Sequence, residues 1–364
     1  MEEVAMSSFW RGRRVLVTGH TGFKGSWLAI WLHSLGARVT GLSLSPRTAP
    51  NLFEEAQVGS LCDSRFGDIR DVQCVRAALD ASVPEVVFHL AAQPLVRASY
   101  VDPVETFHTN VLGTVHVLES IRSCRHVRTA VMVTSDKVYR NDDSGRAYVE
   151  SDPLGGHDPY SASKAACEMV VASYRDSFLA ASGVAVSSAR AGNVIGGGDW
   201  SKDRLVPDAV RAWRQRRPLD VRNPNSTRPW QHVLESLHGY LTLAQRMTED
   251  PSVAGAYNFG PDPGGLASVS AVVDRLQAAM SGSGERGPVA RVGGADGGPH
   301  EARALALDAS LAARTLGARQ ALSLEEAVVR TADWYRRHAA EEPALELCRE
   351  DIRRYEAVRA PIRS

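Results

Sequence analysis

The sequence contains few cysteines and lacks the features of a secreted protein. Its five cysteines are an odd number, lie far apart and include no C-x-x-C pair, which argues against a disulfide framework and a zinc knuckle. The opening MEEVAMSSF carries acids where a signal peptide needs positive charge followed by an apolar stretch. We therefore expect reduced thiols and a cytoplasmic protein.

Charge of one sign and long hydrophobic runs are missing as well. Lys and Arg number 42, as do Asp and Glu, so the formal net charge is zero and gives no overall attraction to nucleic acid or anionic membrane. No apolar run approaches the roughly 18–20 residues that span a bilayer. His89 and His232 have no metal-ligand spacing to other His, Cys or acidic residues. We expect no nucleic-acid partner, no membrane contact, no metal, and a small ligand if the ligand is anionic.

What the sequence does have is a regular alternation of short β-branched runs and helical stretches. Expected strands cover 15–18, 37–44, 86–90, 130–134 and 184–190, and expected helices cover 25–35, 107–123 and 159–180. Such alternation requires parallel strands joined by helical crossovers. The sequence therefore predicts an α/β fold with a doubly wound parallel sheet of the Rossmann type.

A glycine-rich segment, Gly19-His-Thr-Gly22-Phe-Lys-Gly25, lies between the first expected strand and the first expected helix. The first two glycines permit a tight turn and a close approach to a pyrophosphate, and the third lets the helix pack on the strand. The helix dipole favours the same anion. In this place the pattern predicts a dinucleotide site, with a purely structural turn as the alternative.

The acid that usually holds the ribose hydroxyls of NAD is absent from the end of the second strand, 41–47. Ser43 or Ser45 can replace this acid only weakly, and Arg47 can accept the 2′-phosphate of NADP. NAD is still favoured over NADP, although the acid that usually marks an NAD site is missing. Asp68 follows the next short strand and is placed to read the adenine edge. Its alternative role is in a turn before a helix N-cap.

The domain organisation follows from a change of pattern after Asn193, where a Gly-, Pro- and Arg-rich stretch has poor periodicity. The 364 residues suffice for about two domains. We expect a dinucleotide-binding domain over 1–195, with the chain returning to it at about 231–260. A smaller, mostly C-terminal substrate lobe is expected over 196–230 and 261–364, and a helix over 323–338 is expected to end the fold.

Tyr160 and Lys164 are four residues apart on an expected helix, so they share one face. A lysine so placed lowers the tyrosine pKa and yields a phenolate that can take a hydroxyl proton as hydride leaves the same carbon. Upstream, a strand ends in Thr134-Ser-Asp-Lys137, at the edge of the sheet where such folds carry out chemistry. The alternative for the Tyr–Lys pair is a solvated helix face.

These motifs together resemble the extended short-chain dehydrogenase/reductase family. Within it, several longer strings are similar to the CDP-glucose 4,6-dehydratase subfamily, and the similarity covers nearly the whole chain. The strings are Gly19–Lys24, Thr134–Asn141, Asp152–Gly156, Asp158–Lys164, Gly192–Trp200 and Asn223–His232.

The resemblance implies an enzyme that borrows and restores NAD. Such a dehydratase oxidises C4 of a nucleotide-linked hexose, eliminates water across C5 and C6, and returns the hydride to C6. It implies that Tyr160 is the base at the C4 hydroxyl, that Lys164 tunes it and anchors the ribose, and that Ser135 or Thr134 polarises the C4 oxygen. Asp136 would protonate the departing C6 hydroxyl, with pairing to a lysine as its alternative role.

Lys137 stands where related dehydratases of thymidine-linked sugars carry Glu as the base for the C5 proton. It would act either as a neutral amine base or as a clamp on the enolate. The expected NAD-binding residues are Gly19, Thr21, Gly22, Phe23, Lys24, Gly25, Asp68, Ile69, Leu90, Ala91, Ala92, Gln93, Tyr160 and Lys164.

The expected substrate is a nucleotide-diphosphate hexose, with CDP-glucose favoured. Its two negative charges call for convergent cations and amides, and we expect Asn193, Arg204, Arg228 and His232 to bind it. Relatives pair the helices over 107–123 and 159–180 across a two-fold axis, which implies a homodimer. A sugar-nucleotide 4-epimerase, which does not require Asp136, and a non-catalytic dinucleotide-binding protein remain as alternatives.

Overall fold

The computed structural model describes residues 6, 8–261, 266–281, 290–292 and 304–359. Its main element is a seven-stranded sheet in which all neighbouring strands are parallel. This confirms the predicted doubly wound α/β fold. In spatial order the strands are β3 (Asp63–Phe66), β2 (Arg38–Ser43), β1 (Arg14–Thr18), β4 (Val86–His89), β5 (Thr129–Val133), β7 (Ala185–Ala191) and β12 (Ala256–Phe259).

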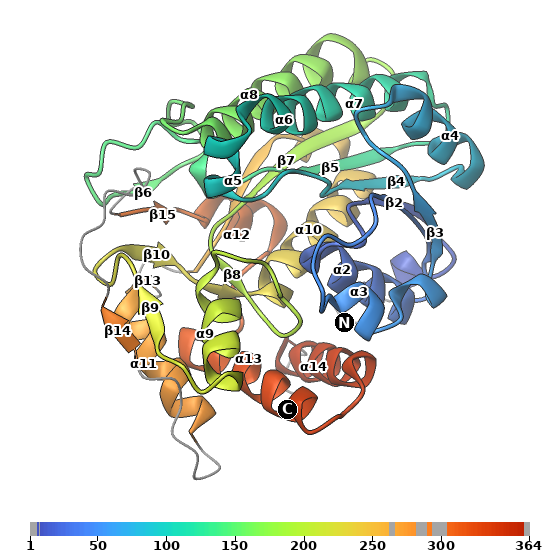
Figure 1. Ribbon diagram of the computed structural model, residues 1–364. Coiled ribbons are helices and arrows are strands. Elements are labelled where there is room, and N and C mark those ends of the chain that lie inside the picture. The colour runs from blue at the N-terminus through green and yellow to red at the C-terminus, as the bar shows by residue number, and fades with distance from the viewer. Residues whose placement is uncertain (1–5, 7, 262–265, 282–289, 293–303, 360–364) are drawn as a thin grey trace, which may run out of the picture.

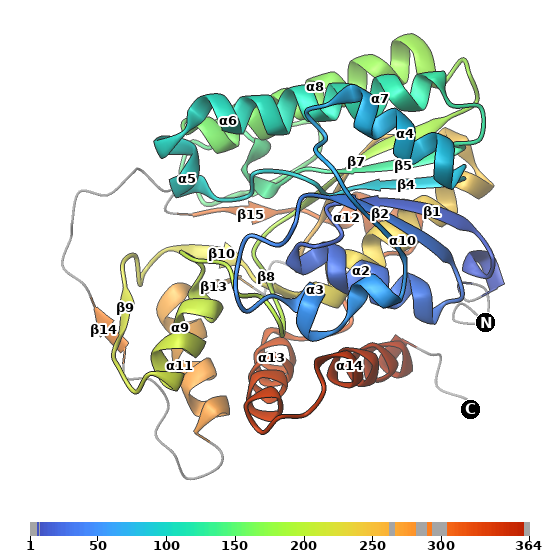
Figure 2. The same ribbon diagram turned by 45° about the vertical axis from the view of Figure 1, so that its right-hand side comes forward.

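The central strands are continuous hydrophobic runs because both faces of the sheet are covered. All residues of β4, β5 and β7 are buried. One face is covered by α4 (Val72–Ser82), α7 (Gly113–Ser123) and α8 (Pro159–Tyr174), and the other by α2 (Phe23–Ser34) and α10 (Val233–Glu249), as Figures 1 and 2 show. Helices on both faces leave the carboxyl ends of the strands open for a ligand.

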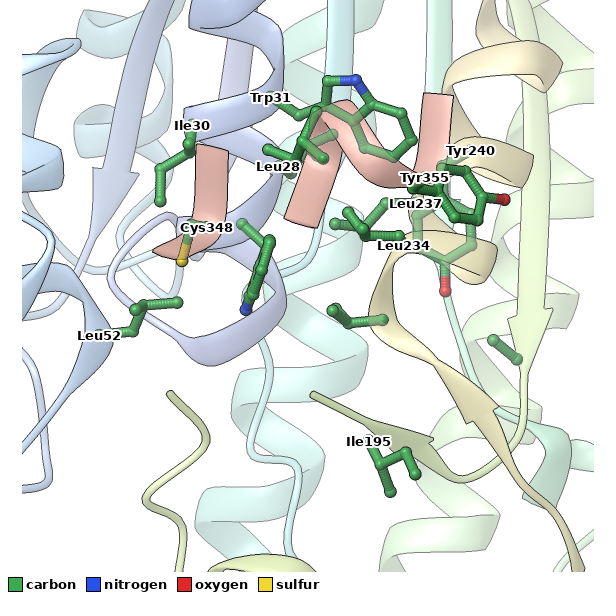
Figure 3. Close-up of a cluster of buried hydrophobic side chains, with 14 of the residues drawn as sticks. Leu28, Ile30, Trp31, Leu52, Ile195, Leu234, Leu237, Tyr240, Cys348 and Tyr355 are labelled. Atoms are coloured by element: carbon green, nitrogen blue, oxygen red, sulfur yellow. The ribbon is translucent and has the colours of Figure 1, made fainter. Parts of the chain in front are cut away.

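The core beneath α2 joins segments that are far apart in the sequence. Trp31 of α2 packs edge-on against Tyr355, with ring centroids 5.7 Å apart. Tyr355 belongs to α14 (Ala344–Arg359), and Leu234 and Leu237 of α10 lie in the same cluster (Figure 3). The C-terminal helix therefore helps to fix the helix that follows the glycine turn.

The remaining elements build a second lobe below one end of the sheet (Figure 2). Its helices include α9 (Leu205–Arg214), α11 (Val269–Met280) and α13 (Leu324–Ala339), whereas α12 (Ser310–Leu316) packs against β12 of the main sheet and against α10. Four strand pairs accompany them: β6 (Ala147–Tyr148) with β15 (Ala306–Leu307), β8 (Val194–Ile195) with β11 (Gln231–His232), β9 (Leu219–Val221) with β14 (Ala290–Val292), and β10 (Thr227–Pro229) with β13 (Leu266–Ser268).

Short helical turns complete the described chain: α3 (Leu52–Glu55), α5 (Val96–Val101), η1 (Val58–Ser60), η3 (Asp136–Val138) and η5 (Pro251–Val253). Within these residues no helix has both the length and the apolar character needed to cross a membrane.

Three helix predictions need correction. The helix expected over 107–123 is divided into α6 (Pro103–Phe107), a π-helical turn η2 (His108–Leu112) and α7. The helix expected over 159–180 is α8 followed by a second π-helical turn, η4 (Arg175–Leu179). The helix expected to end the fold, observed as α13, is followed by α14. Hydrophobic periodicity does not register a π turn, and the charged surface of α14 hides its narrow buried face.

Candidate active site

The glycine turn between β1 and α2 is shaped by backbone contacts that leave no room for side chains. Gly19 has a φ of +79°, and a Cβ there would lie 2.7 Å from the backbone nitrogen of Ala91. A Cβ on Gly25 would lie 2.0 Å from the carbonyl oxygen of Gly19. Glycine at both positions is therefore a steric requirement of this turn.

The N-terminus of α2 is uncapped and lies at the same turn. Its N-cap residue, Gly22, makes no side-chain cap hydrogen bond, and the first turn contains no acidic residue. Among the described residues other than its chain neighbours, a Cβ on Gly22 would meet within 4 Å only the carbonyl oxygen of Gly19, at 3.4 Å. Free N–H groups and the positive end of the helix dipole attract anions, so these residues fit the pyrophosphate of a dinucleotide.

A cavity of about 810 Å³ follows the carboxyl edge of the main sheet. It brings together every residue predicted to bind cofactor or substrate or to carry chemistry, with one exception. The residues it collects are Gly19, Thr21, Gly22, Phe23, Lys24, Gly25, Asp68, Ile69, Leu90, Ala91, Ala92, Gln93, Thr134, Ser135, Asp136, Lys137, Tyr160, Lys164, Asn193, Arg204 and Arg228.

The exception is His232, which does not line the cavity. Its side chain is fully buried, its Nδ1 accepts a hydrogen bond from the backbone N–H of Leu234, and its Nε2 lies 3.4 Å from a carboxylate oxygen of Asp351. The ring also packs edge-on against Trp27. His232 therefore caps α10 and contacts α14, and the structure does not bring it to the cavity with the other predicted substrate-binding residues.

The segment that follows β2, 44–47, supplies no acidic side chain to the cavity, as the sequence indicates. The Thr21 hydroxyl donates a hydrogen bond to the carbonyl of Leu44 at 2.9 Å and lies 2.8 Å from the Ser43 hydroxyl. Asp68 accepts hydrogen bonds from the backbone N–H and the Nε of Arg70, each at 2.9 Å. These bonds lower the pKa of Asp68. The helix N-cap is the next acid, Asp71, whose side chain accepts from the backbone of Gln73.

Tyr160 and Lys164 lie on the first turns of α8 and are both buried. Lys164 Nζ donates to the carbonyl of Val133 at 3.2 Å. Burial raises the pKa of Tyr160 to about 12, and a hydrogen bond with Ser135 offsets only part of this increase. The lowered phenol pKa expected from the sequence is therefore not found in this state, because desolvation of the phenolate outweighs the nearby cations.

The four residues after β5 point their side chains in two directions. The Thr134 hydroxyl donates to Glu168 on α8, whereas the Ser135 hydroxyl donates to Asp136 Oδ1 at 3.0 Å and lies within hydrogen-bonding reach of Tyr160. The donor capacity of Thr134 is thus already used by α8. Of the two hydroxyls that the sequence leaves open, Ser135 is the one directed at the phenol.

Asp136 presents an unpaired oxygen inside the cavity. The residue is 2% exposed, and its Oδ2 finds no hydrogen-bond partner among the described residues. Lys137 Nζ lies 3.7 Å from the other oxygen, Oδ1. A buried carboxyl oxygen without a partner is costly, so this atom is suited to a ligand hydroxyl.

Three further cations, Lys24, Arg204 and Arg228, line the same cavity as this carboxyl. Arg204 pairs with Asp199 at 3.0 Å, and Arg228 donates to the carbonyl of Thr227 at 2.8 Å. Lys24 Nζ donates to the hydroxyl of Tyr240 at 3.1 Å. Burial, with Arg204 and Lys164 nearby, lowers the pKa of Lys24 to about 7. Such a lining favours a ligand that carries phosphate charge.

Comparison with known proteins agrees with this geometry. The family model described as GDP-mannose 4,6 dehydratase matches residues 16–331. The chain belongs to this dehydratase family. A CDP-glucose 4,6-dehydratase from Salmonella typhimurium is 43% identical over 354 residues, which cover 96% of this chain and 97% of that protein. A dTDP-glucose 4,6-dehydratase from Xanthomonas campestris is 27% identical, covering 88% and 92%.

Solved structures share the fold. A UDP-glucose 4-epimerase from Thermus thermophilus in complex with NAD has a TM-score of 0.75 at 26% identity, covering 89% of this chain and 99% of that one. A dTDP-glucose 4,6-dehydratase from Bacillus anthracis has a TM-score of 0.74 at 20% identity, covering 90% and 98%. The predicted membership in the extended short-chain dehydrogenase/reductase family is thereby confirmed.

The sequence analysis did not predict several buried residues outside the cavity that hydrogen-bond the segments forming it. Asn110, on the π turn η2, donates to the carbonyl of Gln93 at 3.1 Å and to the Ser163 hydroxyl at 2.9 Å, and accepts from the Gln93 N–H at 2.8 Å. Asn110 thereby fixes the loop after β4.

Glu168 and Arg190 form a buried ion pair at 2.8 Å. The only sequence signals are a polar residue in an apolar helix and an acid four residues after Lys164.

Proposed function

We propose that this protein is a CDP-glucose 4,6-dehydratase. The observation that carries the proposal is the 43% identity, over nearly the full length of both chains, to the Salmonella typhimurium protein of that name. The cavity agrees with it, because a buried carboxyl with an unpaired oxygen lies beside a Ser–Tyr pair and several cations.

The proposed cofactor is NAD, which when bound accepts a hydride from the sugar and later returns it. Gly19, Gly22 and Gly25 would hold its pyrophosphate against the uncapped N-terminus of α2. Thr21 and Asp68, with the loops after β3 and β4, would hold the rest of the dinucleotide. The complexes of the Thermus epimerase and the Bacillus dehydratase with NAD support this choice.

Tyr160 is the proposed base that takes the proton of the C4 hydroxyl. Ser135, which reaches Tyr160, would donate a hydrogen bond to the developing C4 carbonyl oxygen. The positive charge of Arg204 lowers the pKa of Tyr160 and so favours the phenolate against its burial. Lys164 would bind the ribose next to the nicotinamide.

Asp136 is the proposed acid for the departing C6 hydroxyl, because its Oδ2 is buried and free to face it. Lys137 is partly exposed, with 29% of its side chain accessible, and would act at C5 as a base or as a clamp on the enolate. A 4-epimerase needs no acid at C6, so the unpaired oxygen of Asp136 favours the dehydratase. The presence of both Tyr160 and Lys164 argues against a non-catalytic protein.

The second lobe is the proposed nucleotide-sugar-binding domain, formed by 196–230 and 261–364. Arg204 and Arg228 would bind the diphosphate, and Asn193 would donate its amide to a phosphate oxygen. All three line the same cavity as Asp136.

A homodimer is proposed on the face of the molecule made by α5, α6, η2, α8 and η4, of which α6 and α8 lie at the top of Figure 1. Seven exposed large apolar side chains belong to these elements, and exposed apolar surface favours an interface. They are Tyr100, Val101, Val104, Phe107, Leu112, Met169 and Phe178.

The five cysteines are all unpaired, which fits a reducing compartment and the proposed cytoplasmic location.

The test is incubation of the purified protein with NAD and CDP-glucose, followed by mass spectrometry of the nucleotide sugar. We expect a product that has lost one water, with the ultraviolet absorbance of a 4-keto sugar in base. UDP-glucose, dTDP-glucose and GDP-mannose are the comparison substrates. Failure to turn over any of them would refute the assignment.

A further inference from the structure

A buried ion pair lies directly behind the strand end that carries Ser135. Glu168 is on α8, and Arg190 is near the end of β7. Glu168 Oε2 accepts hydrogen bonds from Arg190 Nη2 at 2.8 Å and from the Ser188 hydroxyl at 2.6 Å, while Oε1 accepts from the Thr134 hydroxyl. Both oxygens of this carboxylate are therefore occupied.

One face of α8 holds the end of β5 at two successive residues. Lys164 donates to the carbonyl of Val133, and Glu168, four residues later on the same helix face, accepts from Thr134. The next residue is Ser135, and Asp136 opens the short helix η3. The position of the catalytic hydroxyl and acid is thus set from the helix that carries Tyr160.

Arg190 holds the other end of the same segment. Its Nη1 donates to the hydroxyl of Tyr139 at 2.7 Å and to the carbonyl of Glu150 at 3.0 Å. Tyr139 directly follows η3 and also donates to Asn258 at 2.7 Å. Glu168 at Thr134 and Arg190 at Tyr139 therefore bracket the segment 135–138, which contains three of the proposed catalytic residues.

A buried ion pair is a poor way to gain stability, because two charges must be stripped of water. Apolar residues of similar volume often serve stability as well or better. In this protein the pair instead holds the chain in place, because its hydrogen bonds fix Thr134 and Tyr139 on either side of the reacting groups. Displacements of about 1 Å at a catalytic group are enough to cost roughly 100-fold in rate.

We propose that Glu168 and Arg190 are positioning residues that hold the segment 135–138 in its reactive place. The inference rests on the proposed dehydratase function. Neither residue lines the cavity, so both act through Thr134 and Tyr139 rather than on the substrate.

The first test is Thr134→Val, which removes the hydroxyl at nearly constant volume and leaves the ion pair intact. We expect kcat for CDP-glucose to fall by about tenfold or more while KM stays within about threefold, since the substrate-binding arginines are untouched. With substrate deuterated at C4 of the hexose, the isotope effect on kcat should rise, because hydride transfer becomes slower than the other steps. Thr134→Ser should recover most of the loss. Ser188→Ala removes another hydrogen bond to Glu168, away from the strand end, and should keep kcat within about twofold.

The second test is the double variant Glu168→Leu/Arg190→Met, which replaces the ion pair by apolar side chains. We expect the variant to fold with a lowered thermal midpoint, because the hydroxyls of Thr134 and Ser188 and the carbonyl of Glu150 lose their partners. Its kcat should be as low as that of Thr134→Val, with the same raised isotope effect. Wild-type kcat and isotope effect in Thr134→Val, or in a folded double variant, would overturn the inference while leaving the function in place. A wild-type protein that converts no nucleotide sugar would overturn the proposed function and this inference with it.

Discussion

Replacing Asp136 by Asn removes the acidic proton but keeps the size of the side chain and one hydrogen-bond-accepting oxygen. The amide oxygen can still accept the hydrogen bond from Ser135, and no protein partner is lost at the second position, because Oδ2 has none among the described residues. The contact with Lys137 at 3.7 Å involves a partly exposed amine and contributes at most about 1 kcal/mol. We therefore expect the free energy of unfolding to change by about 1 kcal/mol or less.

The loss should fall on one step of the reaction. General acid catalysis contributes about 100- to 10,000-fold, so elimination of water should slow by that factor while C4 oxidation continues. The assay follows the absorbance of reduced cofactor and, by mass spectrometry, the loss of water. Reduced cofactor should accumulate in Asp136→Asn, and the matched variant Asp80→Asn, at an exposed position of α4 away from the proposed dimer face, should behave as wild type. Elimination at the wild-type rate in Asp136→Asn would refute the role given to this acid.

Three further predictions concern the cofactor turn, the pH dependence of stability and the dimer face. Gly25→Ala places a Cβ 2.0 Å from the Gly19 carbonyl oxygen, so calorimetric titration should show loss of NAD binding, and wild-type affinity would contradict the steric argument. Burial lowers the pKa of His89 to about 3, whereas the imidazole of the unfolded chain has a pKa of about 6.5. Below pH 6.5 the unfolded state therefore binds one proton more than the folded state. The free energy of unfolding then decreases as the pH is lowered, by up to about 1.4 kcal/mol per pH unit. Urea unfolding at pH 7 and pH 5.5 should show a smaller acid loss in His89→Gln, and an unchanged loss would exclude this group. Val101→Glu/Val104→Glu puts charge on the most exposed apolar residues and should halve the mass measured by light scattering, whereas an unchanged dimer would place the interface elsewhere.

The alternation of strands and helices was enough to predict the main sheet, because parallel strands buried on both faces leave a strong hydrophobic signal. The glycine turn was predictable for a similar reason, since only one residue type fits a position such as Gly25. His232 shows the limit of motif reasoning. It belongs to a string that resembles the family, yet its ring turns away from the cavity toward Asp351.

The supporting contacts of the site were not predictable in the same way. Asn110 acts from a π turn that periodicity does not reveal, and the Glu168–Arg190 pair joins a helix and a strand that only the folded topology brings together. The choice between Thr134 and Ser135 likewise needed the direction of each hydroxyl. Side-chain direction at a strand end depends on what packs behind it, and the local sequence does not contain that information.

The central claim is that one hydride leaves C4 of the hexose and returns to C6 of the same molecule. The most direct measurement uses CDP-glucose deuterated at C4, with NAD and the purified protein, and locates the label in the product by NMR. We predict a 4-keto-6-deoxy sugar with the deuterium at C6. Deuterium retained at C4 of an epimerised or unchanged hexose would contradict the account.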